Sequence, residues 1–230
     1  GDHGTNTLGA IAGFYPGKLI GPAFGASYIL GKTENSEWER HIEEDHWVAG
    51  AEWADSLGAD IISSSLGYRE FDSGQGDYTW QDMDGNTTIV TIGADIAASR
   101  GILVVNSAGN EGSATGGMNT LVAPSDGDSV LAIGAVDATG MRVYFSSMGP
   151  TADGRIKPDV MARGSGTVCA SPSNPTGYLG VSGTSLSCPL VAGAAALLLQ
   201  VNPQATNMEI IQALKTTASQ AGSPDNQYGW

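Results

Sequence analysis

The sequence is poor in cysteine, in positive charge and in long apolar runs. Its 230 residues contain two cysteines, Cys169 and Cys188, which are too few for a disulfide framework, and their redox state stays open. Ten Lys and Arg residues stand against 24 Asp and Glu, a formal net charge of −14 without a basic cluster. Because nucleic acid requires a basic surface, we expect no nucleic-acid partner. The longest apolar run, residues 190–199, is far shorter than the roughly 18 residues that cross a bilayer, so we expect no membrane span.

The chain does have enough apolar material for one buried core. Hydrophobic residues make up 41% of the chain and charged residues 15%, which is typical of a folded domain and not of a disordered chain. A length of 230 residues suits a single large domain, because compact cores grow until about 250 residues. Glycine is abundant, at 33 residues without a collagen-like period, and this indicates many tight turns.

Helical and strand-like patterns alternate along the chain. A short one-sided apolar pattern covers residues 5–12, helices are predicted at 37–57, 89–99 and 190–199, and a Thr206/Glu209 capping box begins a last helix. Strands are predicted at 60–64, 101–106 and 130–136. Continuous apolar strands between helices are typical of a parallel sheet covered on both faces. We therefore predict one α/β domain, with helix 190–199 inside the protein and the polar stretch 68–86 inserted on its surface.

A serine stands where a helix is predicted to begin. Gly183-Thr184-Ser185 precedes the apolar helix, and Pro189 is predicted in its first turn, where proline is tolerated. Ser185 would then lie at the positive end of the helix dipole, near backbone N–H groups that can hold the oxyanion formed when a hydroxyl attacks a carbonyl. Taken alone, a serine at this place is more often a simple helix cap.

Two further motifs supply what such a serine lacks. His3, in a His-Gly-Thr motif, would provide a base with a pKa near neutrality. Asn110 ends a Ser-Ala-Gly-Asn motif after an apolar strand, and it would donate an amide N–H to an oxyanion at the carboxyl end of that strand. Taken singly, such a histidine is usually solvated and such an asparagine usually belongs to a turn.

Together, these motifs resemble those of the subtilisin-like serine proteases, the subtilases. The histidine motif with Gly9, residues 107–110, and residues 183–189 with Gly193 are similar to the histidine, oxyanion and nucleophile motifs of that family. Residues 65–67 resemble the strand that lines its substrate cleft, and residues 154–160 match a further signature without a catalytic role. The resemblance covers essentially the whole chain. It implies the three-layer α/β sandwich of the family, with a mainly parallel central sheet flanked by helices.

The resemblance also implies a serine-type endopeptidase that hydrolyses polypeptides through an acyl-enzyme. Ser185 would be the nucleophile and His3 the general base, while Asn110 and the Ser185 backbone N–H would form the oxyanion hole. An extended substrate would pair with one wall of the cleft and face a second wall. These walls are Ser65, Leu66 and Gly67 on one side and Ser107, Ala108 and Gly109 on the other. The chemistry needs no cofactor, and a secreted or cell-envelope location is what the family implies.

One member of the family's catalytic triad has no counterpart in the sequence. The family carries an aspartate on a strand before the histidine motif, whereas only Gly1 and Asp2 precede His3, and Asp2 is too close to orient the same imidazole. We therefore expect residues 1–230 to be a subtilisin-like peptidase domain that lacks the N-terminal strand with this aspartate and the extreme C-terminal end. Loss of the aspartate costs about 10⁴ in turnover, so such a piece would be weak or inactive.

Two alternatives follow from the missing strand. The exposed sheet edge would allow self-association, because unpaired strand edges recruit other strands. The protein as a whole would alternatively be a non-catalytic peptide- or protein-binding module that retains the subtilase fold. An Asp-Ser/Thr-Gly motif upstream favours the enzyme, and its absence favours the binding module.

Two polar clusters raise the question of a metal. Residues 82–86, Asp-Met-Asp-Gly-Asn, place oxygen ligands at alternate positions, and subtilases often carry calcium, so a structural Ca²⁺ is weighed against a solvated acidic loop. His41 and His46 flank Glu43, Glu44 and Asp45, but residues five apart do not share a helix face. This spacing favours a charged helix surface over a zinc site.

Overall fold

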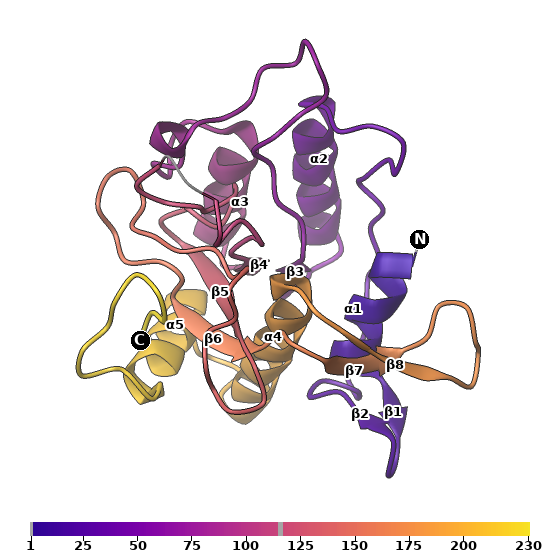
Figure 1. Cartoon of the computed structure of the whole chain (residues 1–230). Helices are drawn as coiled ribbons and strands as arrows, with labels where there is room; N and C mark the ends of the chain where they lie inside the picture. The colour runs from indigo at the N-terminus through magenta and orange to yellow at the C-terminus, as the bar shows by residue number, and fades with distance from the viewer. Residues whose placement is uncertain (1, 115–116) are drawn as a thin grey trace.

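A four-stranded parallel sheet forms the centre of the computed structural model, which describes residues 2–114 and 117–230 (Figure 1). The strand order is β3-β4-β5-β6. Pairs such as Ile61↔Leu103, Val104↔Val130 and Ile133↔Val160 fix the parallel register. The strands are β3 (Ile61–Ser64), β4 (Leu103–Ser107), β5 (Val130–Val136) and β6 (Val160–Arg163).

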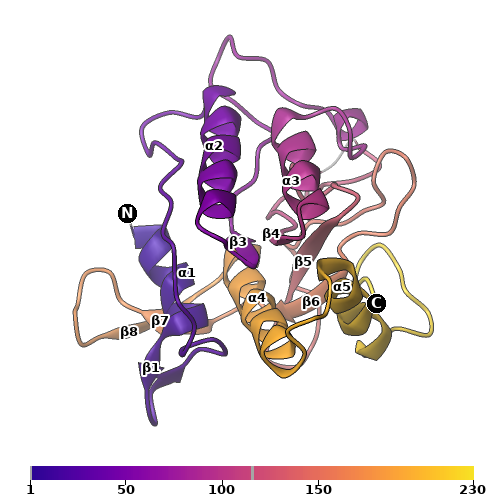
Figure 2. The same ribbon diagram turned by 180° about the vertical axis from the view of Figure 1, so that it is seen from behind.

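Helices cover both faces of this sheet, which confirms the predicted three-layer α/β arrangement. Helix α4 (Thr184–Val201) packs against all four strands on one face, and α5 (Asn207–Thr217) packs on α4. On the other face, α3 (Ile89–Ser99) packs against β4 and β5, with α2 (Ile42–Ser56) beside it (Figures 1 and 2). Alternation along β4 serves both layers, because Val104 joins the core under α2 and α3 while Leu103 and Val105 join the core under α4.

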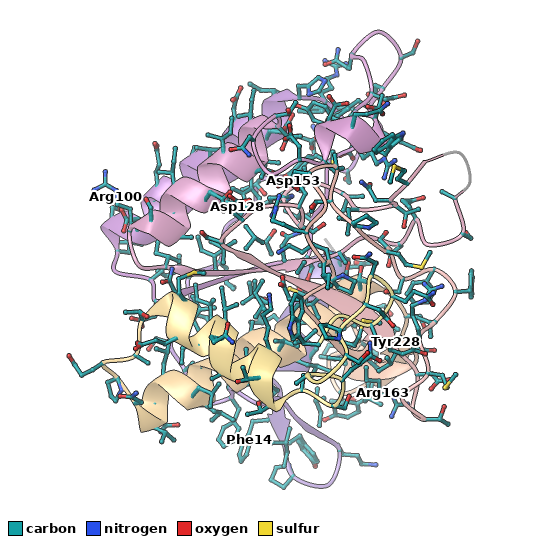
Figure 3. The ribbon with its side chains drawn as sticks, turned by 90° about the vertical axis from the view of Figure 1, so that its left-hand side faces the viewer. Phe14, Arg100, Asp128, Asp153, Arg163 and Tyr228 are labelled. Carbon is teal, nitrogen blue, oxygen red and sulfur yellow. The ribbon has the colours of Figure 1, made fainter. Side chains whose placement is uncertain are left out.

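Short elements flank the sandwich on one side. Helix α1 (Asp2–Ala12) packs against α4 and against β7 (Thr167–Ala170), which forms an antiparallel ribbon with β8 (Tyr178–Val181). A Cβ on Gly9 would lie 2.7 Å from the backbone nitrogen of Ala170, so glycine lets α1 approach this ribbon. The hairpin β1 (Phe14–Tyr15) and β2 (Leu19–Ile20) follows α1, and Figure 3 shows Phe14 projecting from it. A 3₁₀ turn, η1 (Trp80–Asp82), precedes α3.

Several predicted elements match the structure closely. The helix at 89–99 and the strand at 130–136 have the predicted bounds. The side chain of Thr206 accepts from the backbone nitrogen of Glu209, and the Glu209 carboxylate accepts from the Thr206 nitrogen, so the predicted capping box begins α5. The helix predicted from residue 37 begins only at Ile42.

Two predictions about burial are wrong, the first of them in part. The stretch 68–86 is exposed without a break from residue 72 to residue 77, but Tyr68 and Met83 are fully buried in the core beside α2 and α3. Glu43 and Glu44 are also fully buried and do not form an exposed charged face. Their carboxylates accept backbone N–H groups from other segments, Glu43 from Asn35 and Glu44 from Val90, and these hydrogen bonds offset the loss of solvent.

Helix α4 is buried only in part. Its first half lies under the sheet, but Leu197 is 45% and Val201 86% exposed, so the prediction of a helix buried all round is wrong for its second half. By length and composition alone, α4 would suffice to cross a membrane. Its packing against all four strands places it instead in the core of the sandwich.

Candidate active site

Ser185 lies in the first turn of α4. The helix begins at Thr184 after the N-cap residue Gly183, whose φ of +150° favours glycine and which has no side chain to cap the helix. Ser185 is therefore the second helical residue and not the cap, and its N–H is one of the first N–H groups, which have no partner within a helix. The Ser185 Oγ donates to the carbonyl oxygen of Ser65 at 3.3 Å. The hydroxyl thus lies at the positive end of the α4 dipole.

Pro189 leaves the Ser185 carbonyl without a helical partner, and Ser65 supplies one. Pro189 is the sixth residue of α4, so the prediction that it lies in the first turn is wrong. Proline has no N–H to give to the carbonyl four residues earlier, which is that of Ser185. The Ser65 Oγ donates to this carbonyl at 2.8 Å. Two reciprocal hydrogen bonds therefore join Ser65, on the predicted cleft wall, to Ser185.

The side chain of Asn110 is held against the same helix start. Its Oδ1 accepts from the backbone nitrogen of Thr184 at 2.9 Å and from the Thr184 Oγ1 at 3.1 Å. Because Oδ1 is occupied, the amide Nδ2 is left as the free end of an exposed side chain. A Cβ placed on Gly183 would lie 3.8 Å from the Asn110 Nδ2 and 3.8 Å from the Ser185 nitrogen. The two predicted oxyanion donors thus border one small space.

His3 lies in the first turn of α1, which packs against α4. In the views of Figures 1 and 2, each of these two helices begins at its own upper end, near the middle of the molecule. Partial desolvation of the exposed ring lowers its pKa below the ordinary value, which favours a neutral imidazole able to accept a proton. Within residues 2–114 and 117–230, no hydrogen bond joins His3 to Ser185, whose hydroxyl is turned to Ser65.

The two predicted walls leave the sheet side by side. Residues 65–67 continue β3 and residues 107–109 lie at the end of β4, and the pair Ser64↔Asn106 is the last register pair between these strands. Ala108 is fully buried and Ser107 is 4% exposed. The walls therefore come from neighbouring parallel strands at their carboxyl ends, where such sheets place their binding sites.

Sequence reasoning missed Val122, which fills the space between the walls. Its backbone nitrogen donates to the Ala108 carbonyl at 3.3 Å, and a Cβ on Gly67 would overlap its side chain. A Cβ on Gly109, where φ is +111°, would lie 3.0 Å from the same valine and 2.7 Å from the Ser147 Oγ. The sequence signal for this contact was the pair of glycines Gly67 and Gly109 in the two wall motifs, because glycine permits another segment to approach closely.

The signature at 154–160 contributes a buried ion network. The Lys157 Nζ lies 2.7 Å from the Asp159 Oδ2, and the Lys215 Nζ of α5 lies 3.0 Å from the Oδ1. Burial alone would raise the pKa of Asp159, but Lys157 and Lys215 hold it below the ordinary value. The same carboxylate accepts from the backbone nitrogen of Ala132 in β5. This network ties β5, β6 and α5 together.

The loop weighed as a calcium site uses its carboxylates for its own turns. The Asp82 Oδ2 accepts from the Thr79 nitrogen at 2.6 Å, and the Asp84 Oδ1 accepts from the Asn86 nitrogen at 2.8 Å. The Arg155 Nη2 donates to the Asp84 carbonyl at 3.1 Å, so a cationic group already contacts the loop. Arg155 also pairs with Asp128 and Asp153, which lie close together in Figure 3. This donor set does not fit a calcium site.

A second acidic cluster was not predicted. Carboxylate oxygens of Glu34, Glu39 and Glu43 lie within 4.8 Å of one another. Within the described part of the chain, this is the one cluster of acidic, His or Cys side chains close enough together to share a metal ion. The Glu34 Oε1 accepts from the buried Tyr68 hydroxyl at 2.6 Å. Burial, with Glu43 and Glu34 nearby, raises the pKa of Glu39 to about 7. Neither His41, stacked on Phe71 at 3.9 Å between ring centroids, nor His46 belongs to this cluster.

Comparison with known proteins places this arrangement in a family. The family model described as the subtilase family matches residues 1–230. Subtilisin DY of Bacillus licheniformis is 34% identical over 96% of this chain and 71% of its own length. Subtilisin NAT of Bacillus subtilis subsp. natto is 35% identical over 96% of this chain, which spans about half, 51%, of that relative.

Solved structures agree with the sequence comparison. The self-cleaved protease domain of PatA superposes with a TM-score of 0.74 at 28% identity, covering 95% of this chain and 76% of that one. The MycP3 protease from the type VII (ESX-3) secretion system shares the fold, with a TM-score of 0.77 at 22% identity over 99% of this chain and 70% of that one. The chain therefore belongs to the subtilase family of serine proteases and has the subtilisin-like α/β fold.

Proposed function

We propose that this chain carries the machinery of a serine-type endopeptidase that hydrolyses polypeptides through an acyl-enzyme on Ser185. The observation that supports this most is the shared space bordered by the Asn110 Nδ2 and the Ser185 N–H at the start of α4. Donors fixed there before reaction stabilise the negative oxygen of a tetrahedral intermediate without the cost of reorientation. The Asn110 Oδ1 is anchored by Thr184, so its amide group is already oriented.

The reaction starts with a proton transfer. The Ser185 hydroxyl turns from the Ser65 carbonyl, 3.3 Å away, toward the imidazole of His3, which takes its proton as the oxygen attacks the substrate carbonyl. The lowered pKa of His3 keeps the ring neutral and ready to accept. The imidazolium then protonates the leaving amine, and the acyl group stays on the Ser185 oxygen. Water, deprotonated by His3, attacks this acyl-enzyme, and the imidazolium returns the proton to the Ser185 oxygen as the acid leaves. Every step uses side chains and backbone groups, so the chemistry requires no cofactor.

The substrate would lie along residues 65–67. An extended peptide pairs its backbone with such a segment as an added strand, and alternate side chains enter pockets beside it. Residues 107–109 would face the peptide from the other side, with Val122 closing the space between the walls. This arrangement suits an extended polypeptide substrate.

We further propose that the carboxylate that orients His3 lies on a strand outside residues 1–230. In the described part of the chain, β3 pairs with β4 alone, and Ile61 and Ile62 are only partly buried. Residues 27–32 make no backbone–backbone hydrogen bond within that part, and their Ile29 and Leu30 are 40% and 66% exposed. An added strand would cover the free edge of β3, and without such a strand this edge would pair with a second copy of the chain. Secretion or a cell-envelope location is likewise proposed from the family.

Hydrolysis of a chromogenic peptide tests the proposed function. Residues 1–230 should turn over about 10⁴ times more slowly than a chain extended upstream by a strand with an Asp-Ser/Thr-Gly motif. Ser185→Ala should abolish both activities. Ser187→Ala is the matched control, because Ser187 is fully buried and, within the described residues, its Oγ donates to the Thr184 carbonyl alone. An extended chain that binds peptide but does not cleave it would favour the non-catalytic binding module, and sedimentation of residues 1–230 would test self-association.

A further inference from the structure

The buried side chain of Asn106 connects the two walls of the cleft. Asn106 is fully buried in β4, and its Nδ2 donates to the Leu66 carbonyl at 3.0 Å and to the Ser107 carbonyl at 2.9 Å. Leu66 belongs to one wall and Ser107 to the other. Two carbonyl partners fix this end of the amide as the donor, since a carbonyl can only accept.

The contact with Leu66 lies just beyond the end of the strand ladder. Ser64↔Asn106 is the last register pair between β3 and β4. The Asn106 side chain therefore bridges the two segments where backbone pairing between β3 and β4 has stopped. It holds the Leu66 peptide at a fixed angle relative to β4.

This angle decides what the wall presents to a substrate. Along an extended segment, successive carbonyls point to opposite sides. The Leu66 carbonyl points into the protein toward Asn106, and the Ser65 carbonyl accepts from the Ser185 Oγ on the side of the active site. Fixing the Leu66 peptide therefore also fixes the neighbouring groups of Ser65 and Gly67 toward the position of the substrate backbone.

The other end of the amide argues against a role in stability alone. The Asn106 Oδ1 is buried and finds no hydrogen-bond donor within residues 2–114 and 117–230. A buried acceptor without a donor costs free energy, so an apolar residue of the same shape would be a natural choice for the core at this position. What the asparagine adds is the pair of hydrogen bonds made by its Nδ2.

We propose that Asn106 is a positioning residue, which orients the substrate-pairing wall through the Leu66 carbonyl and sets its spacing from the opposite wall. This inference rests on the proposed function, because it assumes that a peptide binds along residues 65–67. It assigns Asn106 no contact with the reacting atoms. Its loss should weaken the use of an extended peptide and leave the reactivity of Ser185 itself intact.

Two phosphonylating reagents separate these effects. A small alkyl fluorophosphonate needs only Ser185 and the oxyanion donors, whereas a peptidyl phosphonate of four residues also uses the wall. In Asn106→Leu, the second-order labelling rate of the peptidyl reagent should fall about tenfold relative to that of the alkyl reagent, which is what one net hydrogen bond is worth. Asn106→Asp should lose less than Asn106→Leu, because burial raises the pKa of the introduced carboxyl and its protonated form can donate to one of the two carbonyls.

Asn207 offers a matched control at the other end of the sheet. Its Nδ2 also donates to two backbone carbonyls, those of Ala98 at 2.7 Å and Ile102 at 3.0 Å, and it is 9% exposed. Asn207→Leu should lower the thermal midpoint without changing the ratio of the two labelling rates.

Each outcome has one meaning. Equal loss with both reagents in Asn106→Leu, or an unchanged ratio in a folded Asn106→Leu and Asn106→Asp, would overturn the positioning role. Because residues 1–230 alone are expected to react slowly, both reagents are first applied to the unsubstituted chain extended upstream by a strand with an Asp-Ser/Thr-Gly motif. If neither reagent labels Ser185 there, the proposed function fails instead, and this result is read before any variant is compared.

Discussion

The link between Pro189 and Ser65 can be tested quantitatively. Ser65→Ala removes the donor to the Ser185 carbonyl, which has no helical partner because Pro189 lacks an N–H. A carbonyl left unpaired costs about 1–3 kcal/mol when buried, and the half-buried position of Ser65 allows water to offset part of this. We therefore expect Ser65→Ala to lower the free energy of unfolding by about 1.5 kcal/mol, near the lower end of that range. For a chain of this length, this is a fall in thermal midpoint of roughly 3–6 °C.

A double-mutant cycle in urea isolates the interaction. Pro189→Ala restores an N–H at the position that bonds the Ser185 carbonyl, so Ser65→Ala should cost less than about 0.5 kcal/mol in that background. Pro189→Ala has a cost of its own because it removes buried atoms, and the cycle cancels that cost. Ser63→Ala is the control, since the exposed Ser63 Oγ has only a 4.0 Å contact with the Cys188 Sγ. Strictly additive costs for Ser65→Ala and Pro189→Ala would show that the two residues do not share the Ser185 carbonyl.

Three further predictions concern the ion network, the cleft wall and the acidic loop. Asp159→Asn should destabilise the protein by about 3–5 kcal/mol at pH 7, because it leaves Lys157 buried without its partner. The pKa of Asp159 is lower in the folded state than in the unfolded one, so its contribution to stability is present above the unfolded pKa and is lost as pH falls through the folded value. The free energies of unfolding of the unsubstituted protein and Asp159→Asn, measured in urea from pH 7 to pH 3, should therefore converge. A constant difference between them would contradict this. Gly67→Ala should lower the free energy of unfolding by about 1–3 kcal/mol, because the new Cβ overlaps Val122. In a Val122→Ala background this loss should be smaller, and an equal loss in both backgrounds would show that the overlap is not the cause. Calorimetric titration with Ca²⁺ should give no heat that depends on Asp84, and saturable heat that disappears in Asp84→Ala would restore the calcium hypothesis.

Three of the four strands of the sheet and the helices that cover it could be predicted because their signals are local, whereas no strand was predicted at β6 (Val160–Arg163). The run at 130–136 is apolar and bounded by turns, and a strand buried on both faces needs no more than that. The Thr206/Glu209 capping box is likewise a contact between residues three apart. Patterns of this kind depend only on near neighbours in the chain, so they can be recognised without knowledge of the tertiary structure.

The errors arose where a distant partner decides the outcome. Glu44 looks like a surface residue until the Val90 nitrogen and the Tyr78 hydroxyl, both far along the chain, are seen to donate to it. Tyr68 lies in a polar stretch but is buried with its hydroxyl on Glu34. In the candidate site, motif order pointed to Ser185 and Asn110, whereas Asn106 and Val122 have no motif and act through contacts that only the fold creates.

The most direct test of the central claim is to locate the group that an alkyl fluorophosphonate modifies. We expect a single adduct on Ser185 by peptide mass spectrometry, formed about 10²–10³ times more slowly in Asn110→Ala because one oxyanion donor is lost. We expect no adduct on the neighbouring Ser187, whose hydroxyl donates to the Thr184 carbonyl. Labelling spread over several serines, or a rate indifferent to Asn110→Ala, would mean that the space at the start of α4 does not stabilise an oxyanion.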